Sequence, residues 1–141
     1  MGDDGAQLWS LNHRLVTVVL GSCVAELDEL GLETKEFFVL DEVGASPYPA
    51  QLADRLMIPR ASVTAYVRSL VAKGLLQRAI DEADLRRHRL ALTDAGEDAL
   101  RRARAALAAG FDERLARVSA SDRAELRRIL LLLVDQSGQH G

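Results

Sequence analysis

The sequence predicts a mainly helical, α+β fold in which one short β-hairpin is inserted among helices. Apolar residues recur at helical spacing through most of the 141 residues, and glycine or proline interrupts that spacing at intervals. Strand-like alternation is confined to the stretch between residues 75 and 92. The length fits one domain, which we expect to comprise residues 1–141.

The first expected helix covers residues 6–30 and ends at Gly31. It carries two apolar stripes, one containing Leu8, Leu11, Leu15 and Val18 and the other containing Val16, Leu20, Cys23, Val24 and Leu27. A helix on the surface of a domain needs one apolar stripe, so the second indicates a further packing partner. A second copy of the chain is the obvious candidate.

Three shorter helices are expected over residues 34–43, 49–56 and 60–73. Thr34 is a candidate N-cap for the first of them. Pro49 suits the first position of the second, because its missing N–H would be unpaired there in any case.

The helix over residues 60–73 has an unusual outer face. Its inner stripe is apolar and consists of Val63, Tyr66, Val67 and Leu70. Its outer face is small, hydroxylated or cationic and consists of Arg60, Ser62, Thr64, Ala65, Arg68 and Ser69. No carboxylate occurs between Arg60 and Lys73, although a solvated face normally mixes both signs of charge. Such a face fits the major groove of DNA without steric or charge conflict.

Residues 75–80 and 87–92 have strand composition, and a charged loop joins them into an expected hairpin with a basic tip. In a winged helix-turn-helix, two short helices joined by a tight turn are followed by a hairpin, and the predicted elements have this order. In that arrangement the second helix enters the major groove and the hairpin, or wing, reaches the minor groove.

The C-terminal part is expected to be helical. Thr93 begins a helix that runs to about Val118, in which Gly110 marks a bend or a close helix crossing. The segment from Ser119 to Asp122 has the form of a capping box and opens the last helix. Residues 129–134 are apolar without a break, which is more than one packing face requires.

The apolar faces of the terminal helices and the basic face of the middle segment predict two regions with different roles. Residues 6–33 and 94–136 are expected to form a dimerisation region of N- and C-terminal helices. Residues 34–93 are expected to form the winged helix-turn-helix.

The charge distribution supports a partner of opposite sign. The net charge is −3, but residues 55–89 carry 8 Lys and Arg against 3 Asp and Glu, whereas residues 1–54 carry 2 against 10. A basic middle on an acidic body is typical of a DNA-facing module. No apolar stretch is long enough for a membrane span, the N-terminus is no secretory signal and there is one cysteine, so we expect a cytoplasmic protein without a membrane partner.

Several motifs resemble the multiple-antibiotic-resistance regulator (MarR) family. They are Gln51–Leu56, Val63-Thr64, Leu70–Arg78, the wing segment Asp84–Arg86, and Leu90–Gly96, preceded by Leu30–Leu32 and Glu36–Leu40. The resemblance covers roughly residues 8–135. It implies a DNA-binding transcription regulator, usually a repressor, that binds a near-palindromic operator as a homodimer through intertwined terminal helices. It also implies release of DNA by a small ligand, often phenolic or anionic.

The resemblance assigns DNA contacts to particular residues. The recognition helix supplies Arg60, Ser62, Thr64, Ala65 and Arg68, and the wing supplies Arg86, its acidic partner Asp84 and the neighbouring Arg87. Asp84 is expected to pair with Arg86 or with Arg78. The sequence departs from the family pattern at three positions, with Leu85 for a second wing arginine, Tyr48 for a threonine cap and Pro59 for a serine.

An effector pocket is expected near aromatic and basic residues of the first two helices, namely Trp9, His13, Arg14, Phe37 and Phe38. The alternative is that these residues lie at the surface or at a dimer interface. Two other functions stay open: redox sensing through Cys23, and a winged helix that binds protein. The chain contains no glycine-rich phosphate loop, nucleophile elbow or metal-ligand spacing, so we expect no enzyme, no cofactor and no metal site.

Overall fold

A computed structural model describes residues 2–135, which form six helices and one antiparallel hairpin. In chain order the elements are α1 (Gly2–Glu29), α2 (Thr34–Glu42), α3 (Pro49–Leu56), α4 (Arg60–Ala72), β1 (Leu76–Ile80), β2 (His88–Leu92), α5 (Asp94–Leu115) and α6 (Ala120–Val134). The mainly helical α+β fold confirms the predicted class, with a winged helix-turn-helix formed by α2 to β2.

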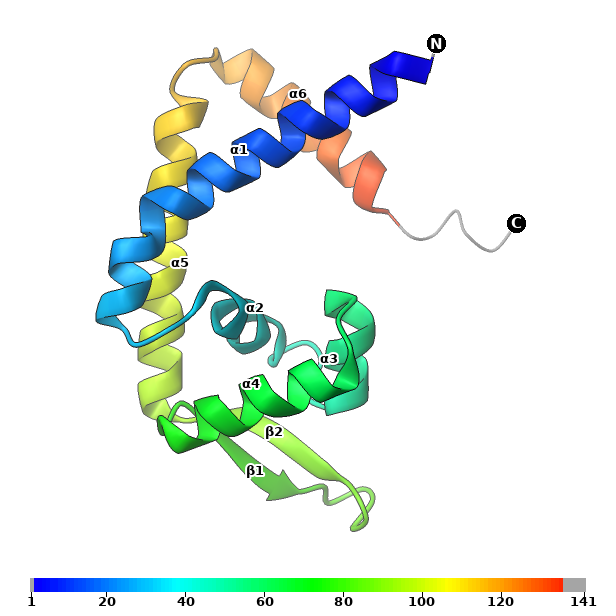
Figure 1. The fold of residues 1–141 in the computed structure, drawn as a ribbon, viewed down its shortest axis with the longest axis vertical. Helices are drawn as coiled ribbons and strands as arrows, with labels where there is room; N and C mark the ends of the chain where they lie inside the picture. The colour runs from blue at the N-terminus through cyan, green and yellow to red at the C-terminus, as the bar shows by residue number, and fades with distance from the viewer. Residues whose placement is uncertain (1, 136–141) are drawn as a thin grey trace.

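The long helix α5 connects the two ends of the molecule (Figure 1). It leaves the hairpin at the lower end, α1 packs along it, and α6 folds back from its upper end. Helices α2, α3 and α4 lie with the hairpin at the lower end. The molecule therefore has two parts. One is the winged helix-turn-helix, and the other is an upper frame made by the three helices α1, α5 and α6.

The hydrophobic core lies in the lower half, where α2, α3 and α4 meet the hairpin and the first half of α5. Its fully buried members include Phe37, Val39, Leu40, Leu52, Val63, Val67, Leu70 and Leu76. The lower end of α1 adds Cys23 and Leu27 to this core. In the portion that the structure describes, α6 buries no side chain. Nor does any helix within residues 2–135 combine the length and apolar character that crossing a membrane requires.

Helices α1 and α5 cross closely at Gly110, as its place in the middle of a helix suggested. A Cβ atom on Gly110 would lie 2.1 Å from Ser22 Oγ, and that hydroxyl donates to the carbonyl of Val19 at 2.6 Å. A side chain at position 110 would therefore displace the Ser22 hydroxyl, and glycine allows the two helices to approach with that hydroxyl in place.

The junction between the hairpin and α5 depends on Thr93 and Gly96. The Thr93 hydroxyl accepts from Gly96 N at 2.9 Å and donates to the Gly74 carbonyl at 2.6 Å. A Cβ atom on Gly96 would lie 2.0 Å from the carbonyl oxygen of Leu75, which is backbone and has little room to move. The Leu-Thr-x-x-Gly motif thus fixes the direction in which α5 leaves the wing.

Several element boundaries differ by one residue from the expected ones, and α5 ends at Leu115 and not near Val118. Helix α1 begins at Gly2, and the N-cap of α2 is Glu33 in place of Thr34. Glu33 serves because its backbone N–H donates to Glu36 Oε1 at 3.0 Å, so the cap is closed by the carboxylate three residues later. The expected end of the last helix at residue 136 lies outside the described residues.

Candidate nucleic-acid interface

Helices α3 and α4 are joined by a tight turn. Met57 ends α3 in the left-handed region, with φ 56° and ψ 44°, and Ile58 N donates back to the Ala53 carbonyl at 3.1 Å. Pro59 is the N-cap of α4 with φ −60°, the value that its ring imposes. The turn therefore has two fixed residues, and it sets the angle between the two helices.

Helix α4 separates its two faces as the sequence predicted. Val63, Val67 and Leu70 are buried against α2 and α3, and Tyr66 is half-buried. The outer face exposes Arg60, Thr64, Ala65 and Arg68, while Ser62 is half-buried beside it.

The polar groups of that outer face remain available for a ligand. Thr64 Oγ1 donates to the Arg60 carbonyl at 3.0 Å, so its lone pairs are left to accept hydrogen bonds. Within residues 2–135 neither Arg60 nor Arg68 is in an ion pair.

Ser69, expected on the outer face, instead belongs to a buried polar cluster. Its hydroxyl donates to Glu36 Oε2 at 2.7 Å, and Lys73 Nζ donates to both oxygens of Glu36 at 2.7 and 2.9 Å. The same ammonium group donates to the Gly31 carbonyl at 2.6 Å. Glu36 is 2% exposed, so the cluster ties the end of α4 to α2 inside the domain.

Burial alone would raise the pKa of Glu36. The hydrogen bonds from Lys73, the Glu33 N–H and Ser69, together with the Lys73 charge, outweigh that effect and lower the pKa below its ordinary value. The carboxylate is thus ionised. Sequence reasoning missed this cluster, whose one local signal was a charged residue directly before the apolar run Phe37–Leu40.

The hairpin pairs Leu76 with Leu92 and Ile80 with His88. Its inner side buries Leu76 and Leu90, and Leu90 N donates to the Pro47 carbonyl at 2.8 Å, which attaches the connector before α3 to β2. The outer side exposes Arg89 and the loop exposes Arg86 and Arg87, while Arg78, on the same face as Leu76 and Leu90, is exposed nearer the wing end of β1.

Asp84 and Arg86 form the wing tip. Asp84 Oδ1 accepts from the Arg86 backbone N–H at 3.0 Å and pairs with Arg86 Nε at 3.5 Å, while Arg78 is not its partner. The Arg86 side chain is 94% exposed, so this pair leaves it accessible. The neighbouring Leu85 is also exposed.

Arg87 lies at the base of the wing and not at its tip. Its guanidinium carbon lies 3.6 Å from the centroid of the Tyr48 ring, and the Tyr48 hydroxyl donates to Asp81. This arrangement differs from the free groove-contacting side chain that the family resemblance implied for Arg87. The departure of Tyr48 from threonine thus has a structural consequence that sequence reasoning did not anticipate.

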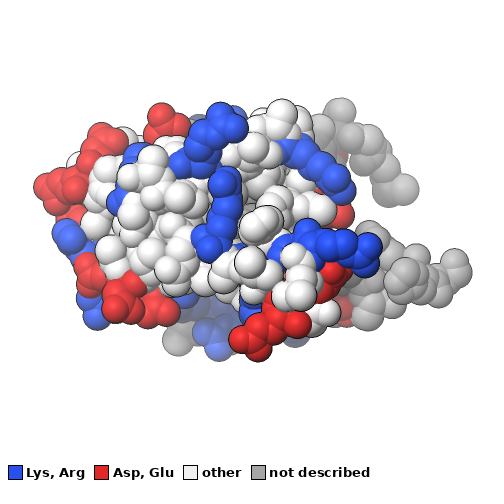
Figure 2. All heavy atoms as spheres, turned by 90° about the horizontal axis from the view of Figure 1, so that it is seen from below, with Lys and Arg blue, Asp and Glu red and all other residues white. Residues whose placement is uncertain are grey.

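Basic side chains cross the middle of the face formed by α4 and the hairpin (Figure 2). Acidic side chains lie mainly at its edges, with one group toward the lower right of the view. A face of this polarity attracts a polyanion.

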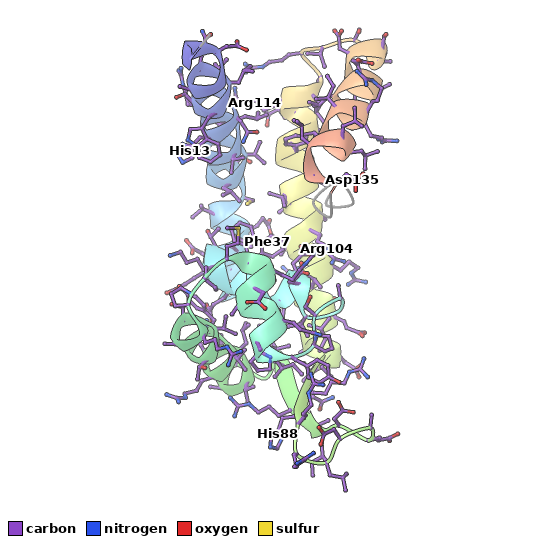
Figure 3. All side chains as sticks on the ribbon, turned by 90° about the vertical axis from the view of Figure 1, so that its right-hand side faces the viewer. His13, Phe37, His88, Arg104, Arg114 and Asp135 are labelled. Atoms are coloured by element: carbon purple, nitrogen blue, oxygen red, sulfur yellow. The ribbon has the colours of Figure 1, made fainter. Side chains whose placement is uncertain are left out.

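The residues expected to form an effector pocket are not brought together. Trp9 and His13 lie on the upper part of α1 with ring centroids 5.9 Å apart, whereas Phe37 is buried in the core of the lower half (Figure 3). Phe37 therefore cannot line an open pocket. Phe38 does line one, but without Trp9, His13 or Arg14.

The pocket beside Phe38 has a volume of about 430 Å³ and lies where α1, α2 and α5 converge. Its lining is almost wholly apolar and consists of Val16, Val19, Leu20, Phe38, Arg104, Leu107, Ala108 and Phe111. Arg104 is its cation, and Arg104 Nε pairs with Asp41 Oδ1 at 2.5 Å. Sequence reasoning missed Arg104 and Phe111 because their approach to α1 depends on the crossing of two helices far apart in the chain.

Cys23 is buried and its thiol donates to the Leu20 carbonyl at 3.2 Å. Burial raises the pKa of this thiol, the opposite of what a reactive cysteine needs. Among the described residues, no three His, Cys, Asp or Glu side chains are grouped as a metal site.

Comparisons with known proteins agree with this geometry. Residues 30–87 match the sequence model of the MarR family, whereas no curated protein sequence matches the chain significantly. Rv2887 of Mycobacterium tuberculosis, a MarR family protein solved with DNA, is 28% identical with a TM-score of 0.73, over 91% of this chain and 98% of that one.

Two further solved structures share the fold at lower identity. CouR of Rhodococcus jostii RHA1 bound to p-coumaroyl-CoA is 21% identical with a TM-score of 0.76, over 90% of this chain and 91% of that one. MarR of Escherichia coli in its apo form is 21% identical with a TM-score of 0.75, over 91% and 97%. Residues 30–87 thus match the MarR family, and the whole chain has the winged helix-turn-helix fold of MarR family regulators that have been solved.

Proposed function

We propose that this chain is a transcription repressor that binds a near-palindromic DNA operator as a homodimer and is released from it by a small aromatic or anionic ligand. The observation that carries the proposal is the outer face of α4. It exposes two arginines that have no ion-pair partner within residues 2–135, together with Thr64 and Ala65, and it carries no carboxylate.

The size and chemistry of this face fit the major groove. The groove is about 12 Å wide and admits one helix, and arginine and hydroxyl side chains match the acceptors on base edges and phosphates. The wing extends beside α4 and offers Arg86 to the adjacent minor groove, whose negative potential attracts a guanidinium group. Rv2887 has been solved in complex with DNA, which supports DNA as the partner of this chain.

A homodimer explains the uncovered apolar surface of the upper frame. Helix α6 exposes a continuous run of large apolar side chains, Ile129, Leu130, Leu131, Leu132, Leu133 and Val134. The upper part of α1 adds Leu8, Trp9 and Leu11. Exposure of this much apolar surface is unfavourable in water, and a second copy that covers it would place two α4 helices on one DNA duplex.

The pocket between α1, α2 and α5 is our candidate effector site. Its apolar walls suit an aromatic ring, and a ligand carboxylate would have to share the Arg104 guanidinium with Asp41, which holds its Nε. Rv2887 has been solved with p-aminosalicylic acid and with salicylic acid, and CouR with p-coumaroyl-CoA, which supports an aromatic acid as the ligand class. A ligand there releases DNA if it binds more tightly to a dimer whose α4 helices are wrongly spaced for the operator.

The DNA-binding part of the proposal is tested by selecting bound duplexes from a random pool with the purified chain. We expect an inverted repeat whose half-site centres lie about one helical turn, ~34 Å, apart. The double variant Arg60→Ala/Arg68→Ala serves as the control and is expected to enrich nothing. Enrichment of no sequence by the wild-type chain, even at low salt, would refute the proposal.

The effector part is tested by thermal denaturation with salicylate, in the wild-type chain and in Ala108→Trp, which fills the pocket. Salicylate is expected to raise the melting temperature of the wild type and not of the variant. Equal shifts in both proteins, or no shift in either, would exclude this pocket as the site.

A further inference from the structure

We propose that Tyr48 is a positioning residue for the wing, holding the hairpin on the start of α3 in the orientation that presents Arg86 to DNA. This role rests on the DNA-binding function proposed above. Tyr48 acts through Asp81 and Arg87, which flank the wing loop on its two sides.

The cluster joins three parts of the chain at one aromatic ring. Tyr48 directly precedes α3, Asp81 directly follows β1, and Arg87 directly precedes β2. The Tyr48 hydroxyl donates to the Asp81 carboxylate while the Arg87 guanidinium lies over the ring face, 3.6 Å from its centroid. Asp81 N also donates to the Arg87 carbonyl at 3.0 Å, so both sides of the loop are fixed to each other and to the body of the domain.

The burial and the hydrogen bonds of Asp81 distinguish this cluster from a chance contact at the surface. Asp81 is 7% exposed although its chain neighbours Ile80 and Glu82 are exposed, and its second oxygen accepts from Ala83 N at 2.9 Å. The hydrogen bond from Tyr48 is the main cause that lowers the pKa of Asp81, and the same bond raises the pKa of Tyr48. Both groups therefore keep the protonation states that the bond requires across the neutral range.

The wing needs such an anchor because a two-stranded hairpin is marginally stable on its own. A mobile wing would lose conformational entropy on binding DNA, and that loss would weaken affinity. With the loop fixed at Tyr48, this ordering is complete before DNA arrives.

The consequence is that the contact made by the wing tip depends on one side chain, although Arg78 and Arg89 are exposed on the strands. Arg87 is occupied at the Tyr48 ring and Leu85 carries no charge, so Arg86 is the cation that the loop between Asp81 and Arg87 presents. Tyr48 and Arg86 should therefore contribute to DNA affinity jointly and not additively.

A double-mutant cycle on operator affinity tests this coupling, with Tyr48→Phe, Arg86→Ala and the double variant. Tyr48→Phe keeps the ring and removes the hydroxyl. We expect it to weaken binding about three- to tenfold in the wild-type background. In the Arg86→Ala background we expect no further loss, because the side chain that the wing presents is already absent.

Hydrogen exchange of the free protein supplies a second readout that needs no DNA. In Tyr48→Phe, amides of residues 81–88 should exchange faster while those of α4 stay unchanged. Wild-type affinity in Tyr48→Phe, an equal loss in both backgrounds, or unaltered exchange in the wing would each overturn the positioning role. A wild-type chain that binds no duplex at all would instead overturn the proposed function, and the role of Tyr48 with it.

Discussion

Met57 is a residue whose side chain conflicts with its backbone. It adopts φ 56° at the turn between α3 and α4, and it is the one non-glycine residue at positive φ among those described. A left-handed conformation brings Cβ close to the following carbonyl, and the exposed side chain makes no buried contact to offset that cost.

We expect Met57→Gly to raise the free energy of unfolding by about 1 kcal/mol, because glycine adopts this conformation without the Cβ clash. Urea denaturation of the purified variant measures the change. Met57→Ala keeps the clash and is the matched control, with no comparable gain expected. Equal stability of the glycine and alanine variants would show that the turn is not strained.

Glu36 makes the stability of the chain depend on pH. Its pKa is lowered in the folded state, so the carboxylate stabilises the fold at pH values above its ordinary pKa of 4.5. That contribution is lost as the pH falls from 4.5 through the lower folded-state value. In the unfolded chain the group binds protons more readily, which is why acid favours unfolding.

Glu36→Gln should cost about 1–3 kcal/mol at neutral pH, because Lys73 loses its charged acceptor inside the domain. It should also flatten the fall in stability below pH 4.5, measured as unfolding free energy against pH. The exposed Glu29→Gln is the control and should leave the curve unchanged. If the unfolding free energy of Glu36→Gln falls below pH 4.5 as steeply as that of the wild type, Glu36 is not the source of the acid sensitivity.

Sequence alone anticipated the residues of the α4 outer face but not the polar clusters. Arg60, Thr64 and Arg68 follow from helical periodicity, which is local in the chain. Tyr48 with Asp81, and Glu36 with Lys73, meet across 33 and 37 residues, and no spacing rule reports such pairs. The contact of Arg87 with the Tyr48 ring was not anticipated for the same reason, since the ring belongs to a distant part of the chain.

For the element α4, we expect different residues to contribute to the affinity for DNA and to the preference for particular bases. Arg68→Ala should weaken binding to all duplexes and reduce the dependence of log affinity on log salt by about one unit, as expected for a phosphate contact. Thr64→Ala should instead alter base preference, read from selected sequences. Arg117→Ala, an exposed arginine just beyond α5, is the control and should change neither quantity.

If the affinity of Arg68→Ala for DNA has an unchanged salt dependence, Arg68 does not contact a phosphate. If Thr64→Ala selects the same DNA sequence as the wild type, Thr64 does not read a base edge.

The elements themselves were largely predictable because their boundary signals are local. Pro49 begins α3, Gly31 and Gly74 adopt φ of 72° and 76° after α1 and α4, and Ser119 with Asp122 caps α6. The N-cap of α2 was assigned one residue late. Glu33 is a poor cap by residue type, and it serves here because the Glu36 carboxylate completes the turn.

At the scale of the whole molecule, the upper frame is incomplete as a single chain. Leu133 on α6 is 76% exposed, and the other large apolar side chains of that helix are also accessible. We expect Leu131→Glu/Leu133→Glu to be a monomer at micromolar concentration by light scattering, because burying two carboxylates in an apolar interface is unfavourable.

Leu85→Glu is the control for that experiment, since it changes an equally exposed leucine on the wing, and it should remain dimeric. A dimer that survives both α6 substitutions would place the interface elsewhere.

The pocket between α1, α2 and α5 could not be predicted from the sequence. Aromatic residues on the first two helices suggested a pocket, but its walls also come from Arg104 and Phe111 on α5. Their position is set by the α1–α5 crossing at Gly110, and a crossing angle is a property of packed helices that periodicity does not specify.

Hydroxyl-radical footprinting on a selected duplex tests whether two chains present α4 and the wing to one DNA molecule. We expect protections related by a two-fold axis, with the two recognition-helix sites about one helical turn apart and a protected minor groove outside each. The outer protections should disappear in Arg86→Ala while the inner ones remain. A footprint without two-fold symmetry, or outer protections that persist in Arg86→Ala, would contradict this arrangement.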